Sequence, residues 1–185
     1  MKNLLTSIIL LFFLTPPLFG QSSEDKKFAL RTSIFAHALT YNLDKNNVVG
    51  FHFGKLSVDI NEDNIEKGVN TFIGVNHAYG FDCVNCDTFF IATLLGPYSA
   101  VFTTDDGSTY SYSGWSMNVR GGYGWYFEND ISVLFGIGPS YGTWSKKSES
   151  LKSNKGYGKD VEDRVKKISF QPISSTPFFS IGYSF

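Results

Sequence analysis

Residues 177–185, PFFSIGYSF, end the chain on a strict alternation of large and small side chains. Every second residue is large and apolar: Phe179, Ile181, Tyr183 and Phe185. The residues between them are small: Ser180, Gly182 and Ser184. A period of two places alternate side chains on opposite faces of a β-strand. Because chain ends are usually polar and frayed, this ending predicts a terminal strand that is held in place on both sides.

The same period of two recurs through most of the chain. Alternating runs occupy residues 28–38, 50–54, 69–76, 115–127 and 131–142, and each presents one face rich in Phe, Trp, Val and Ile. The other face carries Gly, Ser, Asn, Arg and His. Turn-forming residues separate the runs at 44–47, 61–68, 105–107 and 128–130. This pattern predicts an all-β fold built from antiparallel strands.

Composition supports β structure and places few limits on function. The chain has 185 residues, enough for one domain, and its net charge of −1 gives no sign of nucleic-acid binding. Phe and Gly are each present 18 times. After residue 20, no apolar run approaches the roughly 18 residues that a membrane-spanning helix needs.

The N-terminus has the pattern of an export signal. Lys2 precedes an apolar stretch at residues 4–14, Pro16 and Pro17 end that stretch, and Gly20 offers a small residue for cleavage. We expect residues 1–20 to be a cleaved signal peptide and residues 21–185 to form one exported domain. No cysteine follows the expected cleavage point, which argues against a lipid-anchored product.

The apolar face is aromatic near predicted strand ends, as at residues 123–127, and the opposite face is made of small residues that suit a tight barrel interior. With the alternating last strand, these features resemble the small bacterial outer-membrane β-barrel proteins, the OmpX-like or porin-family group. The resemblance implies a closed antiparallel transmembrane barrel, most simply of eight strands, in the bacterial outer membrane. It also implies contact with membrane lipid. In that family the barrel-assembly machinery reads a C-terminal signal, here formed by Phe179, Ile181, Tyr183 and Phe185.

Two arrangements of the eight strands fit the sequence. The preferred one uses 27–38, 47–58, 68–80, 88–102, 108–114, 116–127, 131–144 and 174–185, and leaves 145–167 as a polar, mobile outer loop. That loop carries eight basic and four acidic residues. The rival joins 108–127 into one strand and closes the sheet with a hairpin of 164–171 and 177–185. Neither predicts a helix in the exported domain, and neither leaves a wide channel.

Four residues stand out as candidates for a site. Arg31 and Arg120 fall on the polar face, where we expect them to bridge polar neighbours in the lumen. Cys83 and Cys86 are expected to form a disulfide, because an exported chain meets an oxidising compartment. A metal site with His77 and Asp82 or Asp87, redox chemistry, and free thiols are the alternatives.

No recognisable catalytic motif occurs, and no cofactor or metal is expected. The sequence therefore favours a structural or surface-interaction role without enzymatic activity. Two alternatives remain open. One is a lipid-modifying enzyme that uses His37 or His52 with a nearby serine, Ser33 or Ser57. The other is a soluble periplasmic ligand-binding barrel of the lipocalin type.

Overall fold

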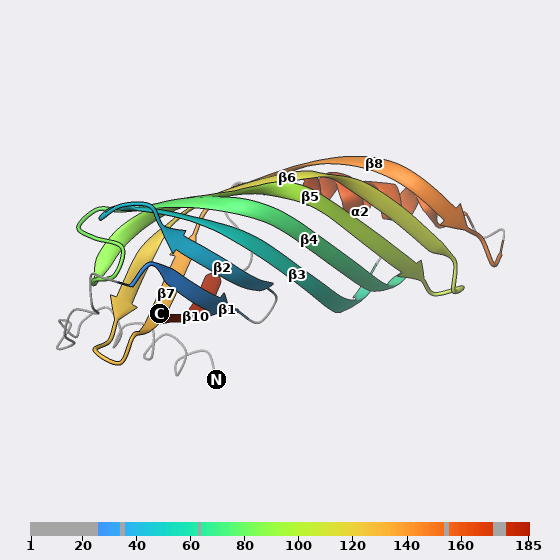
Figure 1. Ribbon diagram of the computed structural model, residues 1–185. Coiled ribbons are helices and arrows are strands. Elements are labelled where there is room, and N and C mark those ends of the chain that lie inside the picture. Colours follow the sequence, from blue (N-terminus) through green and yellow to red (C-terminus); the bar gives the residue numbers. More distant parts are fainter. Residues whose placement is uncertain (1–25, 34–35, 63, 154–155, 172–176) are drawn as a thin grey trace, which may run out of the picture.

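The computed structural model describes residues 26–33, 36–62, 64–153, 156–171 and 177–185, so the expected signal peptide lies outside the described residues. Most of the described chain is β-strand (Figure 1). In chain order the elements are β1 (Phe28–Thr32), β2 (Ala36–Asn42), β3 (Asn47–Glu62), β4 (Ile65–Gly80), β5 (Thr88–Thr104), β6 (Thr109–Tyr126), β7 (Ile131–Ile137), β8 (Ser140–Ser150), α2 (Gly158–Ser169), β9 (Phe170–Gln171) and β10 (Phe178–Ser184).

Eight of the strands form a hydrogen-bonded ring. The antiparallel order is β1–β2–β3–β4–β5–β6–β7–β10, and β10 pairs back with β1. The closing register sets Ala29 against Ser184 and Thr32 against Ile181. The ring joins the first described strand to the last, which confirms the expectation of an all-β fold with eight paired strands.

The ring is closed over only part of the length of its longest strands. β3, β4, β5 and β6 have 16 to 18 residues, whereas β1, β2, β7 and β10 have 5 to 7. Beyond the short strands the long ones continue as an open, curved sheet, in which β8 replaces β7 as the neighbour of β6 (Figure 1). We call this part the sheet extension: residues 55–62, 65–72, 98–104, 109–114 and 144–150.

One helix covers the inner face of the sheet extension. Val161 and Val165 of α2 are buried, and they form a cluster with inward side chains of the sheet: Ile65, Ala100, Phe102, Tyr110 and Tyr112. The expectation that 145–167 is a loop without helical periodicity was wrong. Valines at 161 and 165 and an isoleucine at 168 keep helical spacing, but charged residues surround them. Residues 145–150 continue strand β8.

The strand boundaries correct both arrangements. Residues 27–38 are not one strand, because β1 and β2 are two strands that pair antiparallel with each other, and the Ser33 N–H donates to the Ala36 carbonyl at 2.8 Å. Residues 109–126 are a single strand, as the rival arrangement had it. The closing hairpin of 164–171 and 177–185 was wrong, because 158–169 is helical. The preferred arrangement still reached eight strands, because it joined β1 and β2 into one strand and divided β6 into two.

Candidate functional site

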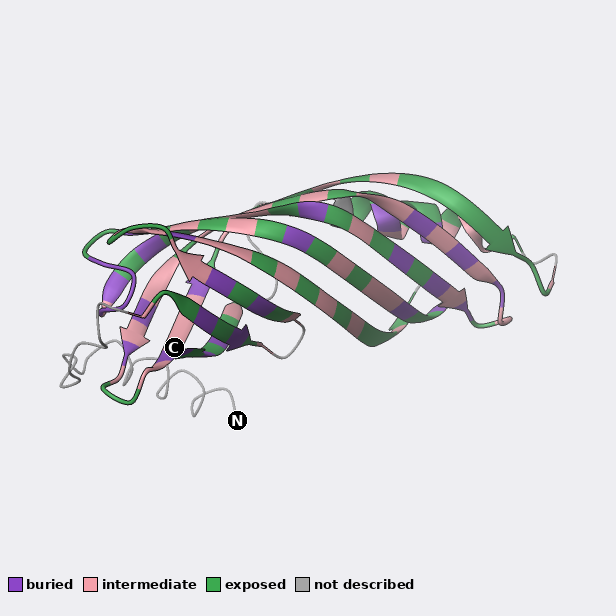
Figure 2. Ribbon diagram, viewed as in Figure 1, coloured by how far each residue is buried: buried purple, intermediate pink, exposed green. Residues whose placement is uncertain are grey.

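The outer surface of the ring is apolar on every strand. Sixteen large side chains there keep 42 to 63% of their surface exposed (Figure 2). They are Phe28, Leu30, Leu39, Phe51, Phe53, Ile73, Val75, Phe89, Ile91, Leu95, Trp115, Met117, Ile137, Phe179, Ile181 and Tyr183. We call this set the outer apolar band. A water-soluble monomer rarely exposes so many large apolar side chains, so the band is a candidate interaction surface.

The apolar face changes sides along a single strand. Next to the ring, where β6 pairs with Tyr141 and Thr143 of β8, Met117 and Trp115 point outward and are exposed. In the extension part of the same strand, Tyr110 and Tyr112 point inward and are buried, while Ser113 takes an outward position. Apolar side chains lie on the face of a strand from which water is excluded, because burial of apolar surface is favourable there. The ring and the sheet extension are therefore built for different surroundings.

Aromatic side chains gather at the end of the ring that holds the 127–130 turn and the C-terminus. The Phe28 ring centroid lies 5.0 Å from that of Tyr41 and 6.1 Å from that of Phe185. The same end carries a second group, with the Tyr123 centroid 4.8 Å from Phe89 and 5.1 Å from Trp125. A third pair joins Tyr79 and Phe81 at 5.6 Å. Aromatics in such a row are typical of the headgroup level of a membrane.

The last strand lies as its alternation predicted. Phe179, Ile181 and Tyr183 point outward, and Ser180 and Ser184 are buried inside the ring. Gly182 also faces inward, where a Cβ atom would come within 2.9 Å of Arg31 Nη1 and 2.8 Å of Ser132 Oγ. The small residues of PFFSIGYSF therefore leave room for an arginine in the lumen. Phe185 packs against Phe28 beside the ring closure.

The lumen of the ring holds a cavity of about 80 Å³, room for a few water molecules. Arg31, only 8% exposed, lines it. Its guanidinium donates to Ser132 Oγ at 2.9 Å and to the Tyr126 hydroxyl at 3.3 Å. Arg120 lines the same cavity, with its guanidinium carbon 5.2 Å from the ring centre of Phe178.

The lumen also contains polar side chains that the sequence analysis did not single out. Asn76, Asn118 and Tyr126 line the cavity from β4 and β6. The sequence places each of them on the polar face of an alternating strand. That position does not distinguish them from other polar residues on the same face, so the sequence did not identify them as lining a cavity.

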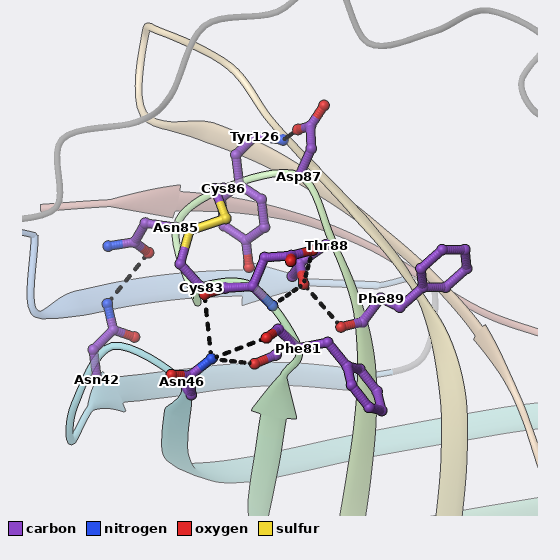
Figure 3. The surroundings of a disulfide bond; sticks show 12 residues. Asn42, Asn46, Phe81, Cys83, Asn85, Cys86, Asp87, Thr88, Phe89 and Tyr126 are labelled. Carbon is purple, nitrogen blue, oxygen red and sulfur yellow. Dashed lines mark hydrogen bonds between the residues drawn. A yellow bond between two sulfur atoms is a disulfide. The ribbon is translucent and has the colours of Figure 1, made fainter.

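A short loop with a disulfide lies between β4 and β5 (Figure 3). Cys83 and Cys86 are joined by a disulfide, with their Cα atoms 5.5 Å apart. Between them, Val84 is buried and lines the cavity, and Asn85 is buried and donates to the Lys26 carbonyl at 3.0 Å.

A second polar network lies at the far tip of the sheet extension. Asp106 accepts hydrogen bonds from Thr104 Oγ1 at 2.8 Å, from the Ser108 N–H at 3.0 Å and from the Ser153 hydroxyl. These donors, with Ser153 the largest contributor, hold the pKa of the Asp106 carboxyl well below its usual value of 3.8. The network ties the β5–β6 turn to the segment that leads to α2.

The histidines do not assemble a hydrolase site. His52 lines the lumen, whereas Ser57 lies five positions on and therefore on the opposite face of β3. His37 is exposed on the outside, and its Nδ1 is bonded to Thr32 Oγ1 at 2.9 Å. Ser33 bonds within the β1–β2 turn, to Ala36.

Among the described residues, no three His, Cys, Asp or Glu side chains are grouped as a metal site would require. In the same part of the chain, no helix is long and apolar enough to cross a membrane. Comparison of the chain with protein-family models, curated proteins and solved structures found no match.

Proposed function

We propose that the protein is a small bacterial outer-membrane β-barrel whose eight-stranded ring crosses the lipid bilayer. The observation that carries the proposal is the change of apolar face along β6. Hydrocarbon around the ring accounts for exposed Trp115 and Met117, and water around the sheet extension accounts for buried Tyr110 and Tyr112. A soluble barrel of the lipocalin type would place its apolar side chains inside along its whole length.

Closure of the ring through the pairing of β1 with β10 also supports the proposal. In hydrocarbon every N–H and C=O group needs a partner, so a spanning sheet must close on itself. The outward apolar residues of β6 run from Trp115 to Trp125, a span of about the 9–11 residues that a tilted transmembrane strand uses. We propose on the same grounds that the protein resembles the OmpX-like outer-membrane proteins.

The orientation follows from the two ends of the ring. We place the C-terminus and the 127–130 turn in the periplasm and the sheet extension outside the cell, since the family has short periplasmic turns and longer outer segments. The outward residues of β10 then serve as the insertion signal for the assembly machinery, and residues 1–20 direct export.

We propose that the protein has a structural role or a role in surface interaction. β3 loses its β2 partner after Gly54, so residues 55–62 form a free edge of the sheet extension. Among the described residues, β8 pairs with β9 through Ser140 and Tyr141 alone, so the rest of β8 forms a second edge of the sheet extension there. An exposed edge offers unpaired backbone groups to a partner outside the cell.

Cell fractionation and gel migration test the membrane proposal together. The protein is expected in the outer-membrane fraction and should migrate differently before and after boiling, because a closed barrel resists detergent until it is heated. Recovery in the soluble periplasmic extract, with a band that does not shift on boiling, would overturn the proposal and favour a soluble binding protein.

A further inference from the structure

The lumen holds two arginines without a matching acid. Arg31 and Arg120 line the same cavity, and none of the described residues around it is Asp or Glu. The four ion pairs of the described chain all lie elsewhere: Lys26–Asp130, Lys146–Glu149, Arg164–Glu62 and Lys166–Asp163. An arginine does not lose its proton in a protein. A buried positive charge at Arg31 beside a half-buried one at Arg120, without a counter-charge, is unfavourable.

The two guanidinium groups also have donors to spare. Each carries five N–H donors in a planar fork. Arg31 uses one nitrogen on Ser132 Oγ and another on the Tyr126 hydroxyl. The Nε of Arg120 is buried and has no acceptor among the described residues. The contact between Arg120 and the Phe178 ring weakens the cost of burial but supplies no negative charge.

We propose that the cavity lined by Arg31 and Arg120 is a binding site for a small monovalent anion of about the size of chloride or nitrate. The cavity of about 80 Å³ admits such an ion and excludes a large organic one such as gluconate. Guanidinium forks bind anions through charge-assisted hydrogen bonds. Asn76 and Asn118 line the same space, and the Asn118 amide nitrogen donates to Ser116 Oγ at 3.2 Å. Val84 of the disulfide loop covers one side of the site.

The test compares thermal unfolding of the folded protein in neutral detergent, in sodium chloride and in sodium gluconate of equal ionic strength. Binding to the folded state alone raises the midpoint, by about 3–6 °C when chloride is tenfold above its dissociation constant. Arg120→Gln is expected to lose this difference. Arg164→Gln, which removes an arginine of α2 outside the ring, should keep it. Equal midpoints of the unsubstituted protein in the two salts overturn the proposal.

Two further measurements decide the matter if Arg120→Gln does not fold. Asn76→Asp keeps the side-chain shape and supplies a carboxylate, so it should raise the midpoint in gluconate and abolish the response to chloride. A full chloride response in Asn76→Asp contradicts the site. Crystals grown in sodium bromide should show an anomalous peak beside Arg31 and Arg120, and a lumen without one contradicts it as well.

The proposal concerns the interior of the ring and stands apart from the proposed function. A chloride response in a protein recovered from the soluble fraction would support the anion site and overturn the membrane proposal. An outer-membrane protein without any chloride response would do the reverse.

Discussion

An arginine placed in the middle of the outer apolar band tests what surrounds the ring. Val75 lies midway along the outward positions of β4 and is 59% exposed, so a longer side chain meets no steric obstacle. Val101 is the matched control, since it is an outward valine of β5, 38% exposed, in the sheet extension. Both residues would be replaced by Arg.

The expected cost differs between the two sites because only one of them faces hydrocarbon. An arginine on the lipid face of a barrel destabilises it by about 2–4 kcal/mol at the bilayer midplane. An exposed substitution in water changes stability by about 0.5 kcal/mol or less. Val75→Arg should therefore lower the free energy of unfolding by about 2–4 kcal/mol, and Val101→Arg should leave it nearly unchanged.

The measurement is urea unfolding in phospholipid vesicles, monitored by tryptophan fluorescence. The free energies of unfolding are compared only if their dependence on urea concentration is the same in all variants. Two results would refute the reasoning. One is a Val75→Arg protein as stable as Val101→Arg, which would show that the band meets water or folded protein. The other is an equal large loss in both, which would mean that the sheet extension is also embedded.

Three other changes have defined outcomes. Val161→Ala should free α2 from the sheet at a cost of about 1–3 kcal/mol, seen as faster proteolysis after residue 150 while the ring keeps its heat-modifiable migration. Gly182→Ala should cost about 1–3 kcal/mol, because the added methyl group meets Arg31, and the loss should appear as a lower unfolding midpoint. Because the pKa of Asp106 is lowered in the folded state, its ionised carboxylate stabilises the folded tip above pH 3.8, and this stabilisation is lost as pH falls below that value. Asp106→Asn should remove this pH dependence from the hydrogen-exchange protection of the turn that Ser153 contacts.

Each of these predictions has a contrary result. Unchanged proteolysis of Val161→Ala would mean that α2 is held by other contacts. An unchanged midpoint of Gly182→Ala would mean that Arg31 moves aside without cost, and Ser99, an exposed outward residue, offers a neutral control as Ser99→Ala. Protection of the tip amides, taken relative to the unfolded chain at each pH, that stays constant in the unsubstituted protein would show that Asp106 contributes no stability there.

The sequence predicted strands well where the alternation was long and failed where it was interrupted. The runs that became β3, β4 and β5 were placed to within a few residues. Residues 27–38 were predicted as one strand because the alternation of side chains continues from β1 into β2 without a turn signal. The helix α2 was missed because Val161 and Val165 are its only two valines in a charged stretch, so its apolar stripe is weak. The cluster that buries these valines comes from β4, β5 and β6, far away in the chain.

For the lumen, too, the sequence predicted one part of the arrangement and not the other. Arg31 and Arg120 could be assigned to the polar face from their position in the alternation. Their shared cavity could not, because it depends on how strands distant in sequence are paired.

The sequence by itself determined which side chains lie together on each face of a strand, down to the outward Tyr183 and the inward Gly182 of the last strand, because that choice is made locally by a period of two. Only the tertiary structure decided that β10 returns to β1, that Arg31 meets Ser132 and Tyr126, and that the apolar face of β6 changes sides between the ring and the sheet extension. Those outcomes depend on strand register and on the packing of α2, which are set by contacts between residues far apart in the chain.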